Sequence, residues 1–184
     1  MKTLFVVTLL GFSLLLQDLP ASQEQKREPQ TISTEPKEVV AELRRGETKL
    51  LEVRGILTYT PTEANYDDTT TGNLFFKLDE KQRLQISNVV KRVIADIPEE
   101  VTIKGIRGIF EKHAKCPDLR YEFRPQKVEV GDAMLHFGSF VVSFKETEQE
   151  LSQLFCRWAK VIEGGRSHPP IRIVNALLKG EKID

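Results

Sequence analysis

Two stretches of alternating apolar and polar residues near the middle of the chain restrict its fold more than any other feature. A period of two is typical of a strand that is buried on one face and exposed on the other. We therefore predict strands at Leu50–Thr60 and Asn73–Glu80. The side chains expected to face inward are Leu51, Val53, Leu57, Tyr59, Leu74, Phe76 and Leu78.

The rest of the segment 50–130 predicts three more strands and one helix. A turn at Asp79–Gln82 is expected to lead into a third strand. A short helix should end at Ile97, because the residue before a proline avoids helical geometry. Gly105 and Gly108 predict a curved fourth strand, and Pro125 restricts the fifth to an edge or a bulge. The expected segments are the strands Arg83–Ser87, Val101–Phe110 and Phe123–Val130 and the helix Val89–Ile97.

This element order resembles the OB-fold, a five-stranded Greek-key barrel. The resemblance depends on Val53–Leu57, Gly72–Leu78 and Val101–Gly105, which combine short strands with glycines where a barrel bends. It covers the OB-like core 50–130 and implies that the outer face of the second and third strands binds the ligand. The expected fold class is α+β and mainly β: a five-stranded OB-like barrel with an added C-terminal strand and amphipathic helix.

The N-terminal segment predicts export. Lys2, the apolar run Leu4–Leu16 and the small residues near Ala21 form the pattern of a secretory signal peptide over 1–22. The polar residues 23–36 predict a disordered linker, and Pro36–Arg45 predicts a short helix. The remainder, 37–184, is expected to be a single globular domain, secreted or periplasmic.

The C-terminal extension 131–180 predicts strand, helix, then strand or short helix. Phe137–Phe144 is expected to be a strand, and Thr147 with Glu150 forms a capping-box pattern at the start of a helix that ends at Gly164. The helix has an apolar stripe, which predicts that it packs on the barrel and closes its mouth. The alternative is a partner-binding helix with Trp158 as its anchor. The final segment is Ile171–Leu178.

Cys116 and Cys156 are the only cysteines. In an exported protein an even pair predicts a disulfide. Cys156 lies off the apolar stripe of its helix, where the loop His113–Leu119 could reach it. Two free thiols and a metal site that also uses His113, His136 or His168 are the alternatives.

Enzymatic and cofactor patterns are weak in this sequence. The spacing Glu63-x-Asn65-x-Asp67 lacks the glycine and the late glutamate of a calcium loop. A thiol enzyme would pair Cys116 with His136 or His168, and no local motif supports that pairing. We therefore predict no catalytic residue, no metal and no cofactor.

Strand parity predicts the binding surface. If the inward residues fill the barrel, then Phe75, Lys77, Arg83 and Gln85 share its outer face, and Tyr66 lies in the adjacent loop 60–72. An aromatic side chain beside cations would suit stacked bases. However, the chain has 27 basic and 27 acidic residues, and the loop contains Glu63, Asp67 and Asp68. This charge distribution does not favour phosphate.

The sequence thus predicts an exported, non-catalytic binding or accessory domain that recognises a protein or carbohydrate partner. An OB-type single-stranded nucleic-acid-binding protein is the first alternative. A thiol- or metal-dependent enzyme is the second.

Overall fold

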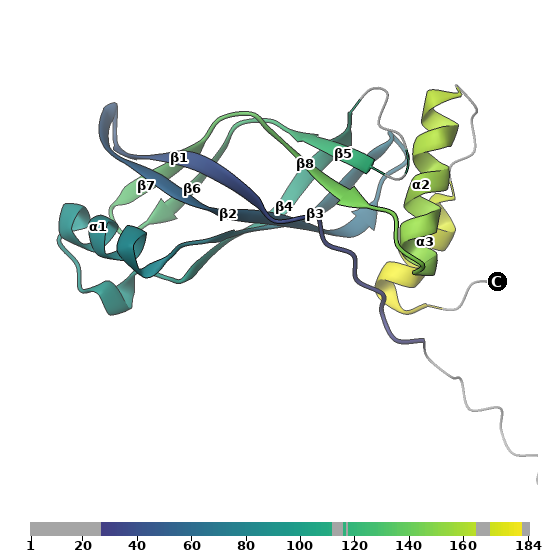
Figure 1. Ribbon diagram of the computed structural model, residues 1–184, viewed down its shortest axis with the longest axis horizontal. Coiled ribbons are helices and arrows are strands. Elements are labelled where there is room, and N and C mark those ends of the chain that lie inside the picture. The colour runs from purple at the N-terminus through teal and green to yellow at the C-terminus, as the bar shows by residue number, and fades with distance from the viewer. Residues whose placement is uncertain (1–26, 112–115, 117, 165–169, 182–184) are drawn as a thin grey trace, which may run out of the picture.

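The computed structural model describes residues 27–111, 116, 118–164 and 170–181. This part of the chain forms eight strands, three α-helices and one short 3-10 helix (Figure 1). The mainly β, α+β class is confirmed, and the expected number of five strands is wrong. The strands are β1 (Lys37–Arg45), β2 (Thr48–Ala64), β3 (Thr69–Lys77), β4 (Glu100–Phe110), β5 (Asp118–Phe123), β6 (Gln126–Val130), β7 (Ala133–Phe137) and β8 (Phe140–Lys145). The helices are α1 (Glu80–Val90), the 3-10 helix η1 (Ile94–Asp96), α2 (Glu150–Glu163) and α3 (Ile171–Lys179).

All eight strands belong to one curled antiparallel sheet with the order β6-β7-β1-β2-β3-β4-β5-β8. The pair β5–β8 at one end and the pair β6–β7 at the other are the two halves of one long hairpin. Phe123 of β5 lies opposite Phe140 of β8, and Gln126 of β6 lies opposite Phe137 of β7, so both halves share one register. The sheet therefore curls until its two ends meet in the same hairpin.

The hairpin is interrupted at 124–125 and 138–139, and this explains two differences from the expected strands. Phe123–Val130 and Phe137–Phe144 were each expected to be one strand, and each spans parts of two. Pro125 has no backbone N–H to donate to a ladder, and Gly138 faces the same break. Pro125 thus lies at a strand end, as its chemistry requires.

The interior of the sheet is filled by large side chains. The alternation expected for β2 and β3 is confirmed, because Val53, Leu57, Tyr59 and Phe76 are fully buried. Aromatic rings from different strands meet edge to face, with centroids 5.0 Å apart for Phe76 and Phe137 and 4.7 Å apart for Tyr59 and Phe123. Such contacts fill the barrel-like interior with side chains.

The helix α1 occupies residues that were expected to form a strand and a later helix. Asp79 begins the helix, because its carboxylate accepts a hydrogen bond of 2.7 Å from the backbone N–H of Gln82. The helix ends at Lys91, which has the left-handed φ of +57°. The expected strand Arg83–Ser87 is therefore wrong, and the expected helix Val89–Ile97 overlaps only the end of α1 and the short 3-10 helix η1. The capping residue Asp79 had been interpreted as part of a β-turn.

The expected helix Pro36–Arg45 is also wrong, because this segment forms β1. Ala41 and Leu43 point inward at a period of two, and β1 pairs with β2 on one side and with β7 on the other. Two neighbouring ladders and the buried alternate residues outweigh the weak local preference for a helix.

Residues 27–36, expected to be part of a disordered linker, have no regular secondary structure but pack along the domain. Ile32 and Thr34 are buried. The backbone N–H of Thr34 donates to the carbonyl of Tyr59 (2.9 Å), and that of Glu35 donates to the carbonyl of Ser143 (2.7 Å). The latter bond covers part of the free edge of β8.

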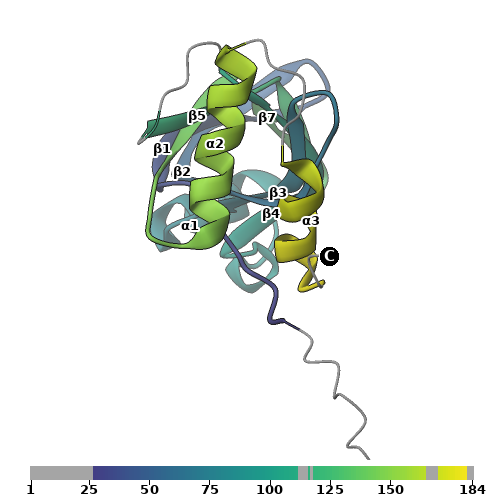
Figure 2. The same cartoon turned by 90° about the vertical axis from the view of Figure 1, so that its right-hand side faces the viewer.

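Helices lie at both ends of the curled sheet. α1 is at one end, and α2 lies across the other with α3 beside it (Figures 1 and 2). α2 begins two residues later than the capping-box pattern predicts, because its N-cap is Gln149 and not Thr147. The backbone N–H of Thr147 donates to Ser152 Oγ (2.8 Å). Ile171–Leu178, left open between strand and helix, is helical. Among the described residues, no helix is long and apolar enough to cross a membrane.

Candidate functional site

The outer face of β3 presents part of the expected binding surface. Phe75 and Lys77 point outward, with Phe75 half-buried and Lys77 exposed. Phe75 lies between Thr58 of β2 and Thr102 of β4 in the ladder register. The position of both side chains on the outer face agrees with the strand parity read from the sequence.

Arg83 and Gln85 do not share that face, because both belong to α1. The side chain of Arg83 is only 16% exposed. Its Nε donates to the carbonyl of Ile97 (3.0 Å), its Nη2 donates to the carbonyl of Ile94 (3.3 Å), and its Nη1 pairs with Glu99 (3.1 Å). Arg83 therefore joins α1 to the η1 segment and is not presented to a partner.

Trp158 is fully buried at the opposite end of the sheet. Its ring lies 4.9 Å from that of Phe110 and 5.8 Å from that of Phe155. Its Nε1 donates to Asp68 Oδ1 (3.2 Å). These contacts support the interpretation in which the apolar stripe of α2 closes the mouth of the curled sheet.

The turn between β2 and β3 presents Tyr66, which is 82% exposed. The two residues that follow Tyr66 hold the turn in place. Asp67 forms an ion pair with Arg107 of β4, and Asp68 accepts the hydrogen bond from Trp158 of α2. Asp68 has a left-handed φ of +59°, a conformation that non-glycine residues seldom adopt. Tyr66 is thus an exposed aromatic side chain on a turn that is fixed to two elements.

A hollow of about 510 Å³ lies beside this turn, on the outside of β4. Its polar lining includes Arg107, Arg124 and Gln126. Asp67 and Thr69 form its wall on the side of the turn, and Ile106 and Ile109 form its apolar part. Arg107 is held in place, because its Nε donates to Thr69 Oγ1 (2.9 Å) in addition to the Asp67 contact.

A second hollow, of about 500 Å³, lies where β1 and β8 separate. Lys37 Nζ crosses this gap and donates to the carbonyl of Val141 (2.6 Å). Val40, which is 49% exposed, and Phe140 supply apolar surface, and Arg120 and Glu122 supply charges of opposite sign. The lysine bridge already occupies the polar edge of this gap.

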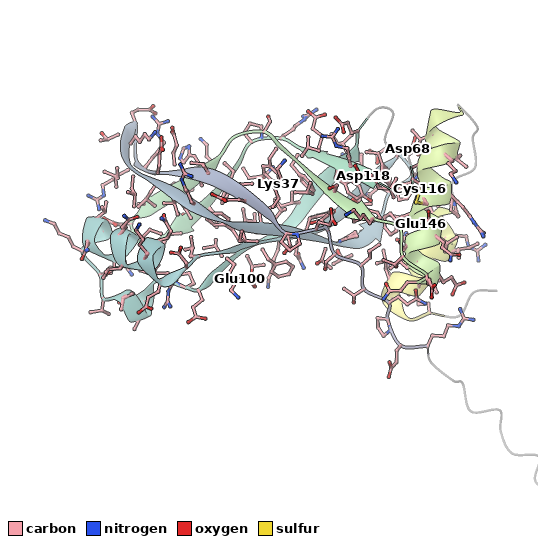
Figure 3. All side chains as sticks on the ribbon, viewed as in Figure 1. Lys37, Asp68, Glu100, Cys116, Asp118 and Glu146 are labelled. Carbon is pink, nitrogen blue, oxygen red and sulfur yellow. A yellow bond between two sulfur atoms is a disulfide. The ribbon has the colours of Figure 1, made fainter. Side chains whose placement is uncertain are left out.

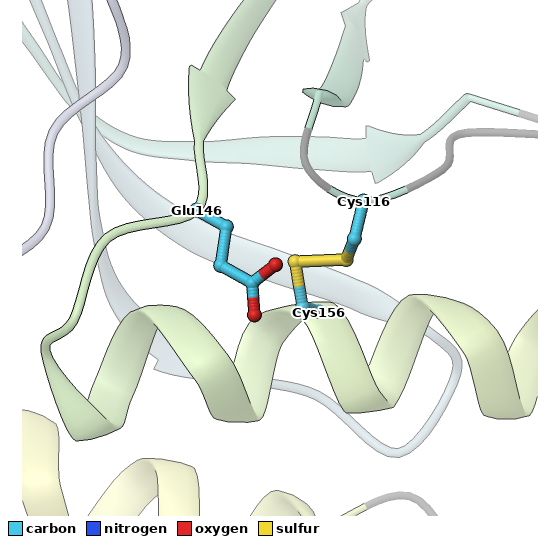
Figure 4. Close-up of side chains that lie close together, drawn as sticks. All are labelled: Cys116, Glu146 and Cys156. Atoms are coloured by element: carbon cyan, nitrogen blue, oxygen red, sulfur yellow. A yellow bond between two sulfur atoms is a disulfide. The ribbon is translucent and has the colours of Figure 1, made fainter.

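The disulfide between Cys116 and Cys156 is confirmed. It joins the segment before β5 to α2 across a Cα–Cα distance of 5.6 Å (Figures 3 and 4). Cys156 is buried in the core rather than lying clear of it. A bridge that closes a loop of 40 residues stabilises the native state by about 4 kcal/mol in the chain-entropy model.

The carboxylate of Glu146 lies beside the disulfide, with one oxygen within 4.8 Å of both sulfur atoms (Figure 4). Two thiolates and a carboxylate would form a ligand set for zinc. In this structure the sulfur atoms are bonded to each other, so neither is a thiolate. His113 and His168, the other ligands considered, lie outside the described residues, and His136 is on β7 opposite Lys127 of β6.

Tyr59 and Tyr121 are the strongly perturbed titratable groups of the interior. Burial raises the pKa of both phenols well above the usual value of 10.0. The Tyr59 hydroxyl has a hydrogen-bond partner in Thr70 Oγ1 (2.9 Å), whereas the buried Tyr121 hydroxyl has none among the described residues. Both phenols are therefore protonated at neutral pH, and both side chains serve to pack the core.

The basic residues around the first hollow are not among the residues predicted from the sequence to bind a partner. Lys104 and Arg107 flank Gly105 on β4, and Arg124 and Lys127 flank the segment that contains Pro125. In both places one cation lies before and one after a residue that interrupts a strand, and this pattern could have indicated the basic surface.

Comparisons of the chain with models of protein families, with curated protein sequences and with solved structures give no significant match.

Proposed function

We propose that this protein is an exported, non-catalytic binding domain that recognises a partner protein or carbohydrate through the turn that presents Tyr66. The observation that supports this most directly is the exposure of Tyr66, 82%, on a turn anchored to both β4 and α2. Tyrosine is enriched among the residues that contribute most of the binding energy at protein interfaces.

Anchoring of the turn reduces the entropic cost of binding, because binding orders side chains and loops that move freely in the unbound protein. Tyrosine contributes a large contact area with few rotatable bonds, and a turn that is already fixed loses little further entropy on binding. The contacts of Asp67 with Arg107 and of Asp68 with Trp158 fix the backbone on the C-terminal side of Tyr66. Asn65, on the other side, donates to Thr69 Oγ1 and Thr71 Oγ1 at 3.1 Å.

Export is supported by the disulfide, because such bonds persist in oxidising compartments. The signal-peptide pattern at 1–22 is a prediction from the sequence and lies outside the described residues. Together they favour a secreted or periplasmic protein.

The curled sheet is compatible with the way OB-like barrels bind ligands, through loops and through the outer face of the central strands. We infer that Phe75 and Lys77 on β3 extend the contact surface from the Tyr66 turn. A partner protein or carbohydrate is favoured over nucleic acid, because the chain has no net charge and the turn itself contributes Asp67 and Asp68.

A photo-cross-linking experiment tests this function. Tyr66 is replaced by p-benzoylphenylalanine in one variant, and Val93, which is 65% exposed on a different segment, is replaced in a matched control. Both proteins are irradiated in the exported fraction of the native host. We expect a discrete adduct from position 66 alone, suppressed by excess wild-type protein and not by Tyr66→Ala. Equal labelling at both positions, or equal competition by Tyr66→Ala, would exclude the turn as the contact site.

A further inference from the structure

The curled sheet is open between β4 and β6. β4 pairs with β5 only at Ile109 and Phe110, and β6 is an edge strand that pairs with β7 alone. We call the opening between the N-terminal part of β4 and β6 the β4–β6 split. Along this split the strand edges lack a ladder partner within the described part of the sheet.

Two local features explain the opening. Pro125 has no N–H to continue the ladder from β5 into β6. On the facing strand, Gly105 has a left-handed φ of +68°, and the register between β3 and β4 shifts between Gly72 and Leu74. A shift of this kind marks a bulge, which bends the strand and disrupts the ladder.

Side chains do not fill the space at the end of the split. The hollow of about 510 Å³ is lined by Gly105 and Arg107 of β4 and, on the opposite side, by Arg124 and Gln126. A Cβ atom placed on Gly105 would have no heavy atom within 4 Å. The two strand edges therefore border one continuous space that is open to solvent.

Basic residues border this space on both sides. Arg107 and Arg124 line the hollow, Lys104 precedes Gly105, and Lys127 follows Gln126. All four are exposed. Arg107 is the only one that forms an ion pair among the described residues, with Asp67.

This charge pattern has two physical consequences. Like charges on adjacent strands destabilise a ladder, so the basic residues oppose direct pairing of β4 with β6. A segment with negative charge placed between them would instead have a cation on each side. Repulsion between the strands and attraction for an acidic segment have the same origin.

We propose that the β4–β6 split binds an extended, acidic peptide segment of a partner protein as an added strand. Its backbone would pair with the free strand edges, and its outward carboxylates would contact Arg124, Lys127 and Lys104. Main-chain hydrogen bonds supply affinity in this mode of recognition, and alternate side chains supply specificity. The proposal rests on the proposed binding function and names the partner class as peptide.

Backbone geometry favours a peptide over an acidic saccharide. Adjacent strands lie about 4.8 Å apart and use every second N–H and C=O of each strand. A saccharide would satisfy the cations and leave the backbone groups of the split to water. A peptide partner is therefore distinguished from a saccharide because blocking its backbone N–H groups should weaken binding.

The probe is a short fluorescent peptide that alternates valine and glutamate, titrated with the wild-type protein and followed by anisotropy. A first control peptide has glutamine in place of glutamate, and a second has N-methyl groups on alternate backbone amides. The test variant combines Arg124→Gln and Lys127→Gln. The matched control is Arg172→Gln, which removes one exposed cation from α3.

We expect the glutamate peptide to bind, with affinity up to about tenfold weaker for each cation removed, because each removal takes away one charge-assisted contact. Arg172→Gln should bind as the wild type does, and both control peptides should bind weakly. Equal binding of the glutamine peptide, or no effect of the double variant, would refute the charge argument. Equal binding of the N-methylated peptide would refute strand addition.

Loss of peptide binding in this assay and loss of cross-linking at position 66 are separate results. A discrete adduct at Tyr66 without peptide binding would refute the split as a peptide site and leave the binding function standing. Binding of a uronic acid oligomer in place of the peptide would assign the basic split to an acidic carbohydrate and overturn the proposal.

Discussion

Two buried tyrosines whose rings pack against each other are predicted to respond in opposite ways to the loss of a hydroxyl group. Tyr59 and Tyr121 are both fully buried, and their ring centroids lie 5.7 Å apart. The hydroxyl of Tyr59 is paired with Thr70 Oγ1, and that of Tyr121 has no partner among the described residues. A phenylalanine at either position keeps the ring and removes only the oxygen.

The magnitudes follow from what each hydroxyl does in the folded state. An unpaired buried polar group opposes folding by about 1–3 kcal/mol. We therefore expect Tyr121→Phe to raise the free energy of unfolding by about 1 kcal/mol. Tyr59→Phe removes the hydrogen bond between the phenol and the buried Thr70 hydroxyl. We expect it to lower the free energy of unfolding by about 1–2 kcal/mol.

Urea unfolding measures both effects, with Trp158, the only tryptophan, as the fluorescent probe. The two variants are matched controls, since each loses one phenolic oxygen from the same cluster. A destabilised Tyr121→Phe variant would refute the reasoning, because it would show that the Tyr121 hydroxyl forms a favourable hydrogen bond in the folded protein.

The same pair predicts how stability depends on alkaline pH. Burial raises the pKa of both phenols above the unfolded value of about 10. The folded state therefore holds its phenolic protons where the unfolded state has lost them. This contribution to stability is complete below pH 10 and declines above it by about 1.4 kcal/mol per pH unit for each tyrosine. Tyr121→Phe should halve that part of the slope, and an unchanged slope between pH 10 and 11 would contradict the burial argument.

Three further changes test the elements that hold the fold together. Reduction of the disulfide, or Cys116→Ser with Cys156→Ser, should lower the free energy of unfolding by about 4 kcal/mol in the chain-entropy model. Urea unfolding measures this change, and a thiol count checks that the bridge is broken. A double variant as stable as the wild type would show that the bridge constrains the unfolded chain little. Gly55→Ala should lower the free energy of unfolding by about 1–3 kcal/mol, because the new Cβ would lie 2.6 Å from the Lys77 carbonyl oxygen and from the Phe76 ring. A melting temperature equal to that of the wild type would mean that β2 and β3 can move apart without cost. Arg83→Ala should increase the hydrogen-exchange rates of η1 more than those of β2, because it removes three contacts between α1 and the segment after it; uniform rates would argue against Arg83 as the link.

The sequence was most informative where burial enforces a strict period. The inward sets of β2 and β3 and the apolar stripe of α2 follow from alternation or helical spacing alone. The structure buries most of these side chains, and Leu51, Val161 and Ile162 are half-buried. The disulfide followed from the number of cysteines and the predicted export.

Local sequence patterns gave the wrong secondary structure where strand pairing or a helix cap determines it. The segment Pro36–Arg45 predicts a helix by its local signals, but it forms β1, with β2 and β7 paired to it on its two sides. α1 was interpreted as a turn and strand because Asp79 serves both as a turn residue and as an N-cap. That error placed Arg83 and Gln85 on a sheet face to which they do not belong. Only Phe75 and Lys77 remain on the expected face.

The candidate surfaces lie where the ladder is interrupted. Both hollows lie at such interruptions, the first where β4 and β6 separate beside Pro125 and the second where β1 and β8 separate beside Gly138. A regular barrel would satisfy its edges internally and present only side chains to a partner. At the second opening Lys37 already bridges the gap to Val141. At the first, Arg107 and Arg124 line the hollow, and the edges of β6 and of the N-terminal part of β4 have no ladder partner among the described residues. Of the two openings, the β4–β6 split therefore has the strand edges and the charges that a binding partner would have to match.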